Sequence, residues 1–550
     1  MCDDPERAGG QTLSPPPLFP DPLGDAVKKL FGLSYLFPYQ RLVMANILEA
    51  AEAAGLSIRW PDDAGGGVPA ADGAAADGPS AEPAADFAEE TGDGGGAGAD
   101  GADLGRQIVI LPTGAGKSLC FQLPAMLLEG PTLVIYPILS LRADQERRLK
   151  ERGFEPVVLR GGQDEGERNR IRERLASGKS RFIIANPEVL LTRKVMEKRK
   201  ALGILHIVID EAHCVSEWGE SFRPDYLRIR EIIDAAGSPL VTAFTATASA
   251  PVLEKIEAGV FGAPARRIIG NPDRSNIRYS AQGCILRDLA VRDLLVKKDL
   301  PAIVFCSSRP GAEKLGAYLR NEFDEMGRPG AREIRFYHAG LSREEKTAVE
   351  QWFFANPLGI LVSTCAYGMG VDKADIRTVI HRDCPPSVEA YLQESGRAGR
   401  DGKVSEAILL WGPGDEGRLK QARSPAGQGR MAALLDYARN TAGCRREALL
   451  RLLDYEGAGD KPETRCCDVC DGEARGNWRE EESVIDFFRR NNRACTASVA
   501  AETLSAAENI RWSVEDAKQA LGALVRAGKL KISRNPLWKN KIVCPGKRGL

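Results

Sequence analysis

Short apolar runs alternate with longer amphipathic stretches over residues 106–265. Such runs are typical of strands that are buried on both faces of a parallel sheet, and apolar residues at helical spacing are typical of the helices that cover it. The alternation predicts a doubly wound α/β domain, which together with a preceding helical segment spans residues 25–270. Its predicted strands lie at residues 108–110, 132–135, 157–159, 182–184, 207–209 and 240–243.

The same rhythm returns over residues 280–412 and predicts a second parallel-sheet domain at residues 271–413. A helical segment, residues 414–476, follows it. The predicted strands of the second domain lie at residues 302–305, 334–337, 359–362, 378–380 and 407–410.

The C-terminal region, residues 477–550, has three helical stretches followed by two short apolar runs around a turn. This order predicts a winged-helix domain. No acidic residue follows Asp516, whereas Lys and Arg are frequent, so the domain has either a phosphate-binding face or a solvated basic tail. We expect its helices at residues 481–491, 496–508 and 514–527, and its hairpin strands at 530–533 and 541–543.

Two segments have compositions that do not support a packed core. Residues 1–24 are proline-rich and predict a disordered lead. Residues 61–105 are mostly Gly, Ala, Asp and Pro without a basic residue, so they bury too little apolar surface to offset their chain entropy. They predict a disordered acidic insertion, either an inert linker or a tether that repels or mimics nucleic acid.

Overall composition narrows the class of protein only slightly. A chain of 550 residues predicts about three or four domains, and 75 Lys and Arg residues nearly balance 76 Asp and Glu residues, which favours no partner. The cysteines are scattered apart from one cluster, as in proteins of a reducing compartment. With no signal-peptide pattern and no apolar stretch long enough to cross a bilayer, we expect a cytoplasmic protein without a membrane partner.

The sequence LPTGAGKS, residues 111–118, lies between a predicted strand and a predicted helix. Strand, Gly-rich loop and helix are the layout of a phosphate-binding loop, although Leu111 stands where the full pattern has glycine. A chance Gly-rich turn is the alternative. In the phosphate-loop interpretation, Thr113, Gly114 and Gly116 lie in the loop whose N–H groups surround the phosphates, Lys117 reaches the β- and γ-phosphates, and Ser118 ligates Mg²⁺.

Two carboxylates end the predicted strand at residues 207–209. Asp210 can hold the water shell of Mg²⁺, and Glu211 can orient and deprotonate an attacking water. An acidic turn at a strand end is common, but one that accompanies a phosphate loop predicts a nucleotide-hydrolysing site in the cleft between the α/β domains.

A pair of arginines, Arg397 and Arg400, lies in the sequence QESGRAGR at residues 393–400. Their spacing predicts that they share one side of a helix. If that side faces the cleft, the arginines can neutralise charge on the γ-phosphate when the domains close; a solvated pair is the alternative.

These motifs occur in the order found in superfamily 2 helicases, and finer matches resemble the RecQ family of DNA helicases. The resemblance covers about residues 25–56 and 106–475. It departs from the family at Glu220, where a His is common, and in the long acidic insertion. The matching segments are residues 30–32 with Gln40, then 113–118, 210–213, 216–226, 245–247, 273–279, 337–341, 366–373 and 393–400.

The resemblance implies an ATP-dependent helicase that moves 3′ to 5′ on single-stranded DNA and unwinds duplexes during repair and recombination. It implies ATP, Mg²⁺ and Zn²⁺ as cofactors, and single-stranded DNA and duplex junctions as partners. We also expect a monomer that meets single-strand-binding or repair proteins, in the nucleoid if the source is bacterial. A nucleic-acid-dependent ATP switch without unwinding and an RNA helicase remain open.

The same resemblance assigns roles to individual residues. Gln40 is implied to contact adenine, although taken alone it favours an ordinary surface position. Arg400 is the favoured arginine finger, with Arg397 beside it. The remaining assignments are Gly370 and Asp372 in the nucleotide site, and Trp218, Phe222 and Arg223 as sensors of single-stranded DNA.

A cysteine cluster falls in the helical segment, where Cys467 and Cys470 form a C-x₂-C pair. With Cys444 and Cys466 it predicts a tetrahedral Zn²⁺ site, against the alternative of a chance cluster. The RecQ family usually has its third ligand three residues before the pair, where this chain has Thr464, so Cys466 is the substitute.

Trp538 is the only aromatic residue of the predicted hairpin. The RecQ family uses an aromatic residue there as a wedge that separates strands. An exposed indole can stack on a terminal base pair, but a large ring can equally cap a small domain core, and both interpretations stay open.

Overall fold

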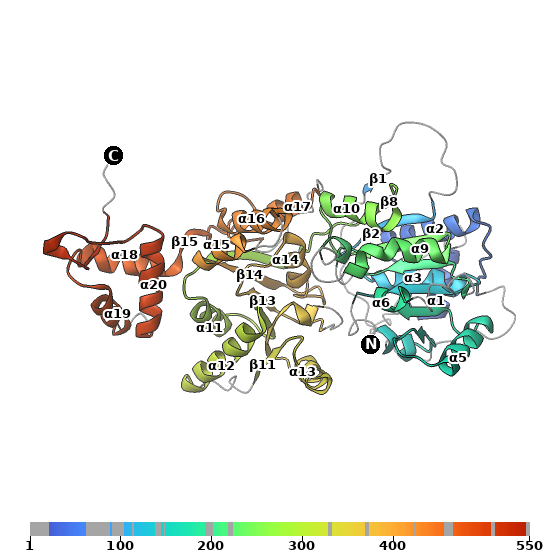
Figure 1. The fold of residues 1–550 in the computed structure, drawn as a ribbon, viewed down its shortest axis with the longest axis horizontal. Coiled ribbons are helices and arrows are strands. Elements are labelled where there is room, and N and C mark those ends of the chain that lie inside the picture. Colours follow the sequence, from blue (N-terminus) through green and yellow to red (C-terminus); the bar gives the residue numbers. More distant parts are fainter. Residues whose placement is uncertain are drawn as a thin grey trace, which may run out of the picture.

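The computed structural model describes residues 21–61, 88–90, 104–112, 115–137, 145–147, 149–192, 202–217, 224–327, 333–368, 373–421, 425–455, 466–507 and 512–545. These residues form two large sheets with helices around each, and a smaller C-terminal unit, arranged in a row (Figure 1). No helix among them is long and apolar enough to span a bilayer. Seven predicted site residues lie outside the described part of the chain: Thr113, Gly114, Trp218, Phe222, Arg223, Gly370 and Asp372.

The first sheet contains all six strands predicted for the first α/β domain. Its order is β1-β8-β2-β7-β6-β3-β5-β4, and every pair is parallel except β1 with β8. The strands are β1 (Ala88–Glu90), β2 (Arg106–Ile110), β3 (Thr132–Ile135), β4 (Val157–Val158), β5 (Phe182–Ala185), β6 (His206–Ile209), β7 (Leu240–Thr245) and β8 (Arg266–Ile269).

Strand β1 corrects the predicted disorder of the acidic insertion at residues 88–90, while residues 62–87 and 91–103 lie outside the described part of the chain. Ala88 pairs with Ile269 and Glu90 with Arg267 along the free edge of β8. An edge strand offers unpaired N–H and C=O groups, so backbone pairing there requires no apolar sequence in the added strand.

Alternate residues of the first sheet pack on opposite faces, as period-two geometry requires. Val109 and Val208 belong to a core with α1, α2 and α3, whereas Ile108 and Ile207 belong to a core with α9 and α10. The helices are α1 (Pro22–Phe31), α2 (Pro38–Ala53), α3 (Lys117–Leu127), α5 (Glu165–Ala176), α6 (Pro187–Leu190), α8 (Cys214–Glu217), α9 (Ile229–Ala236) and α10 (Ala250–Ile256), with shorter turns η2 (Pro224–Arg228) and η3 (Glu257–Phe261).

The second sheet is parallel throughout, in the order β11-β12-β10-β13-β14-β9-β15. Helices α11 and α12 cover one face, and α14, α16 and α17 cover the other. The strands are β9 (Ile277–Gly283), β10 (Ala302–Phe305), β11 (Ile334–Tyr337), β12 (Ile360–Ser363), β13 (Thr378–His381), β14 (Ser405–Trp411) and β15 (Arg475–Trp478); the helices are α11 (Arg287–Lys297), α12 (Arg309–Glu325), α13 (Arg343–Ala355), α14 (Val388–Ser395), α15 (Pro413–Lys420), α16 (Pro425–Arg439) and α17 (Arg445–Leu452), with η5 (Cys365–Gly368).

Besides β1, three strands of these sheets are absent from the predicted set, namely β8, β9 and β15. Arg278, Ser280 and Gln282 interrupt β9, so it has no continuous apolar run. Strand β15 crosses the boundary predicted between residues 476 and 477 and extends the second sheet toward the C-terminal unit (Figure 1).

The C-terminal unit has the predicted order of three helices and a hairpin. Its core includes Val484, Phe488, Leu521 and Leu524. The elements are α18 (Arg479–Arg490), α19 (Ala497–Ser505), α20 (Val514–Arg526), β16 (Lys531–Ile532), η6 (Pro536–Trp538) and β17 (Ile542–Val543).

A buried carboxylate fixes this unit against the second sheet domain. Glu480, which is 1% exposed, accepts hydrogen bonds from the backbone N–H groups of Ile285 (2.8 Å) and Leu286 (3.4 Å). These N–H groups immediately precede α11, where a carboxylate also meets the positive end of the helix dipole. Beside them, Arg479 donates to Asp293 at 2.6 Å.

We expect Glu480→Ala to lower the free energy of unfolding by about 1–3 kcal/mol, because two buried N–H groups lose their acceptor. Urea unfolding measures this, and limited trypsin digestion should release the C-terminal unit sooner. Glu482→Ala is the control, since that side chain is exposed on the same helix. Equal stability of the two variants would contradict the docking role.

Candidate nucleotide-binding cleft and cysteine cluster

The phosphate-loop region joins β2 to α3 as predicted. Leu111 is fully buried, and its N–H donates to the Thr245 carbonyl at 3.0 Å, so this position continues the sheet and needs no glycine. Gly116 has φ 73° and caps α3, a conformation that disfavours any side chain. Lys117 begins the helix, and its Nζ donates to the Leu111 carbonyl at 3.2 Å. The lysine side chain therefore folds back over the loop with which it is predicted to bind phosphate.

Gln40 is buried against this loop, which contradicts the surface interpretation of that residue. Its Nε2 donates to the Ala115 carbonyl at 3.1 Å, and its Oε1 accepts from the Phe37 N–H at 3.1 Å. The Tyr39 hydroxyl donates to the same Ala115 carbonyl at 3.2 Å. The glutamine thus helps to hold the loop, and its contact with adenine remains a prediction.

The acidic pair, Asp210 and Glu211, follows the carboxyl end of β6, at the same end of the sheet as the phosphate loop that follows β2. Glu211 has φ 51°, an uncommon value for a residue with a side chain, and its N–H donates to Asp210 Oδ1 at 3.0 Å. Burial, followed by the charge of Glu211, raises the pKa of Asp210, while Lys117 opposes that rise. A divalent cation bound beside Asp210 would favour its carboxylate form, so the pair suits a Mg²⁺ site.

A histidine connects the acidic pair to the end of β7. His213 Nδ1 lies 3.1 Å from Thr245 Oγ1 and 3.4 Å from Glu211 Oε2. The Thr245 hydroxyl donates to the Thr247 carbonyl at 3.0 Å. The sequence marked 210–213 and 245–247 as motifs but assigned no role to His213 or Thr245, and only the spatial pairing shows that the two motifs form one network.

The two arginines do not lie on a helix face, so that prediction is wrong. Helix α14 ends at Ser395, and the next residues form turns in which Gly399 has φ 54° and donates to the Ile376 carbonyl at 2.8 Å. This glycine conformation ends the helical path before Arg400.

Arg397 lies within electrostatic reach of the catalytic candidates of the first sheet domain. It is 3% exposed; burial and then Arg400 lower its pKa to about 10, whereas Glu394 and Glu211 act in the opposite direction. The first and second sheet domains also meet where Ser249 Oγ donates to Glu389 Oε1 at 2.6 Å. The two sheet domains are therefore in contact, and the charge of Glu211 acts on Arg397 across them. The role of Arg397 or Arg400 as the arginine finger stays a prediction.

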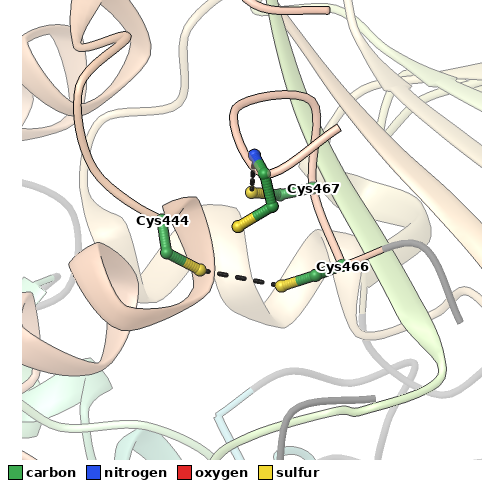
Figure 2. A group of neighbouring side chains, drawn as sticks. Cys444, Cys466 and Cys467 are labelled. Carbon is green, nitrogen blue, oxygen red and sulfur yellow. Dashed lines mark hydrogen bonds between the residues drawn. The ribbon is translucent and has the colours of Figure 1, made fainter. Parts of the chain in front are cut away.

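All four cysteines of the predicted cluster meet at the N-terminal end of α17, and Cys444, Cys466 and Cys467 are labelled in Figure 2. The four sulfurs, including that of Cys470, lie within 4.8 Å of one another. The sulfurs of Cys444 and Cys466 are 3.6 Å apart. Sulfurs around a tetrahedral zinc, each at about 2.3 Å, are separated by about 3.8 Å. The donor set fits a zinc ion, and Cys466 lies inside it.

Trp538 does not cap the C-terminal core, so the core interpretation is wrong. The residue is 37% exposed and is not among the residues that pack against that core, whereas Trp478 and Trp512 are. Lys541 Nζ lies 5.5 Å from the centre of the Trp538 ring. An exposed indole beside a lysine is available to stack on a base next to a phosphate.

Comparison with known proteins agrees with this arrangement. The DEAD/DEAH box helicase family matches residues 101–256, and the helicase conserved C-terminal domain matches residues 286–402. The probable ATP-dependent DNA helicase RecS of Bacillus subtilis is 40% identical over 314 residues, covering 56% of this chain and 61% of RecS. The ATP-dependent DNA helicase RecQ of Pasteurella multocida is 34% identical over 372 residues, covering 66% of this chain and 57% of that protein.

A solved structure of the helicase MrfA bound to DNA has the same fold at a TM-score of 0.51 and 17% identity, covering 96% of this chain and 60% of MrfA. Two parallel-sheet domains, the first with a phosphate loop and an acidic pair and the second with an arginine loop, define a superfamily 2 helicase core. The chain belongs to the RecQ family of these helicases. It spans about three fifths of the length of RecS and of the Pasteurella RecQ protein.

Proposed function

We propose that this chain is an ATP-dependent DNA helicase that moves 3′ to 5′ on single-stranded DNA and unwinds duplexes. One observation carries the proposal. The buried Arg397 of the second sheet domain is within electrostatic reach of Glu211, which lies beside Asp210 and the phosphate loop of the first. A site divided between two domains links hydrolysis to their relative motion.

The proposed reaction uses groups on both sides of the cleft. Lys117 and the loop N–H groups bind the phosphates of ATP, and Asp210 with Ser118 would hold Mg²⁺, which when bound neutralises phosphate charge. Glu211 orients a water toward the γ-phosphorus and takes its proton, and Arg400 or Arg397 stabilises the charge that spreads over the transferred phosphoryl group. Loss of phosphate then reopens the cleft.

DNA is the proposed track, with the predicted sensors Trp218, Phe222 and Arg223 linking its binding to hydrolysis. RecS and the Pasteurella RecQ protein are named DNA helicases, which supports DNA over RNA. We further propose a cytoplasmic monomer that acts in repair and recombination, where single-strand-binding or repair proteins would be its partners.

A substrate panel tests the activity. We expect the wild-type protein to hydrolyse ATP faster with single-stranded DNA and to unwind a DNA duplex with a 3′ overhang, but not the same duplex with a 5′ overhang. Lys117→Ala should reduce hydrolysis at least about 10²-fold while DNA binding is retained, because the lysine acts on phosphate. Unwinding of RNA alone would favour an RNA helicase, and stimulated hydrolysis without unwinding would favour an ATP switch.

We also propose that Cys444, Cys466, Cys467 and Cys470 hold a structural Zn²⁺. Metal analysis should find one zinc per chain, and Cys466→Ser should lower zinc retention during chelator treatment and lower the melting temperature, because metal binding contributes to folding stability. Cys495→Ser is the control, since Cys495 lies outside the cluster. Full zinc content in the Cys466 variant would show that this residue is not a ligand.

Trp538 is proposed to separate the strands at the duplex end. Trp538→Ala should unwind duplex DNA about 10-fold more slowly, because one base-stacking contact is lost, while keeping DNA-stimulated hydrolysis and the wild-type melting temperature. Trp512→Ala is the matched comparison and should instead lower the melting temperature, since Trp512 packs against the core. Undiminished unwinding by the Trp538 variant would place the separator elsewhere.

A further inference from the structure

The linker between the two sheet domains holds the arginine loop, residues 396–400, by its backbone. Arg274 donates to the carbonyls of Gly396 (3.2 Å), Ala398 (3.2 Å) and Gly399 (2.9 Å). Asn276 Nδ2 donates to the Gly399 carbonyl at 2.7 Å. Three carbonyls of a five-residue loop are therefore bound by two side chains that lie more than a hundred residues earlier in the chain.

The loop depends on donors from outside because it has left the helical path. Beyond Ser395 the α14 ladder ends, and carbonyls that the helix would have satisfied need other partners. A guanidinium group has five N–H donors in one rigid plane, so Arg274 serves several carbonyls at once and fixes their relative directions. The side chains of Arg397 and Arg400 are carried by the same peptide units.

The linker is in turn held from the opposite side by α17. Arg446 Nη1 lies 2.7 Å from Asp273 Oδ1, and its Nη2 donates to the carbonyls of Ser275 (3.2 Å) and Ile277 (3.0 Å). Arg446 is 4% exposed, and the side chain of Asp273 is 6% exposed. A buried arginine with an ion pair and two backbone bonds leaves little freedom to the segment that contains Arg274.

We propose that Arg274 is a positioning residue for ATP hydrolysis, which sets the direction of the arginine loop and is itself fixed by the Arg446–Asp273 pair. The inference rests on the proposed function. Through this chain of contacts, the helix that begins at the cysteine cluster governs how the arginines meet the γ-phosphate. Misplacing a catalytic group by about 1 Å costs about 10²-fold in rate, so loosening the loop acts on turnover more than on nucleotide binding.

Steady-state hydrolysis with saturating single-stranded DNA tests the proposal. Arg274→Ala should lower kcat by about 10- to 100-fold with the KM for ATP changed less than about 3-fold, and Arg274→Lys should recover part of the loss. Arg292→Ala is the control, because Arg292 is a comparably bonded arginine that binds Asp293 and Glu322 on the opposite face of the sheet. It should change stability without this separation of kcat from KM.

A double-mutant cycle shows whether Arg274 acts through the loop. In a chain that already carries Arg397→Ala and Arg400→Ala, the additional Arg274→Ala change should lower kcat by less than about 2-fold, since no arginines remain to be placed. A full additional loss in that background would overturn the proposal, as would an unchanged kcat in the single variant.

Trypsin digestion supplies a readout that is independent of activity. Loosening the loop should expose the bonds after Arg397 and Arg400, so Arg274→Ala should be cut there sooner than wild type and sooner than Arg292→Ala, as mass spectrometry would show. Equal cutting would overturn the positioning role while leaving the proposed function intact. A wild-type protein that hydrolyses no ATP with any nucleic acid would overturn both.

Discussion

The nucleotide site depends on the parallel pairing of β2, β7 and β6, which brings three motifs to one edge of a buried sheet. Ile110 pairs with Thr245, and Ile209 pairs with Ala243, so the residues that follow β2 and β6 emerge beside the end of β7. Alternate residues of these strands pack in two different cores, one on each face, so a slip by one residue would exchange the side chains between the cores and disrupt the packing of both. Lys117, Asp210 and Thr245 are neighbours for this reason.

The edge gathers charges that burial alone would oppose. Asp210 has a raised pKa and Arg397 a lowered one, and in both cases burial is the largest cause. Opposite charges on the two domains offset part of that cost, and phosphate with a divalent cation would offset more. Asp210 and Arg397 are costly to bury without a ligand, and both are proposed to act on a bound nucleotide. A nucleotide that binds both groups would therefore stabilise the closed arrangement of the two domains.

Three consecutive residues make α17 a junction between the parts of the chain. Cys444 belongs to the cysteine cluster, Arg445 pairs with Asp468 in the segment that carries the other cysteines, and Arg446 pairs with Asp273 in the linker. The three residues lie at the start of one short helix, Cys444 as its N-cap and Arg445 and Arg446 as its first two residues. A change in the position of Cys444 would therefore also move Arg446 and, through it, the linker. The helical segment thus connects the cysteine cluster to the linker between the two sheet domains.

The amino-acid sequence by itself determined the two α/β domains, the order of the motifs and the C-terminal helices and hairpin. Those features follow from local apolar periodicity and from residue types whose chemistry is local, as in Gly116 followed by Lys117. The tertiary structure decided the burial of Gln40, the exposure of Trp538 and the turn that carries Arg397 and Arg400. It also decided the pairing of β1 with β8 and of β15 with β9, and the hydrogen bonds of Arg274 to the arginine loop. Apart from the exposure of Trp538, these features are set by partners distant in the chain, 75 residues away for Gln40 and 122 or more for Arg274. No local pattern records which distant carbonyl or strand edge a residue will meet.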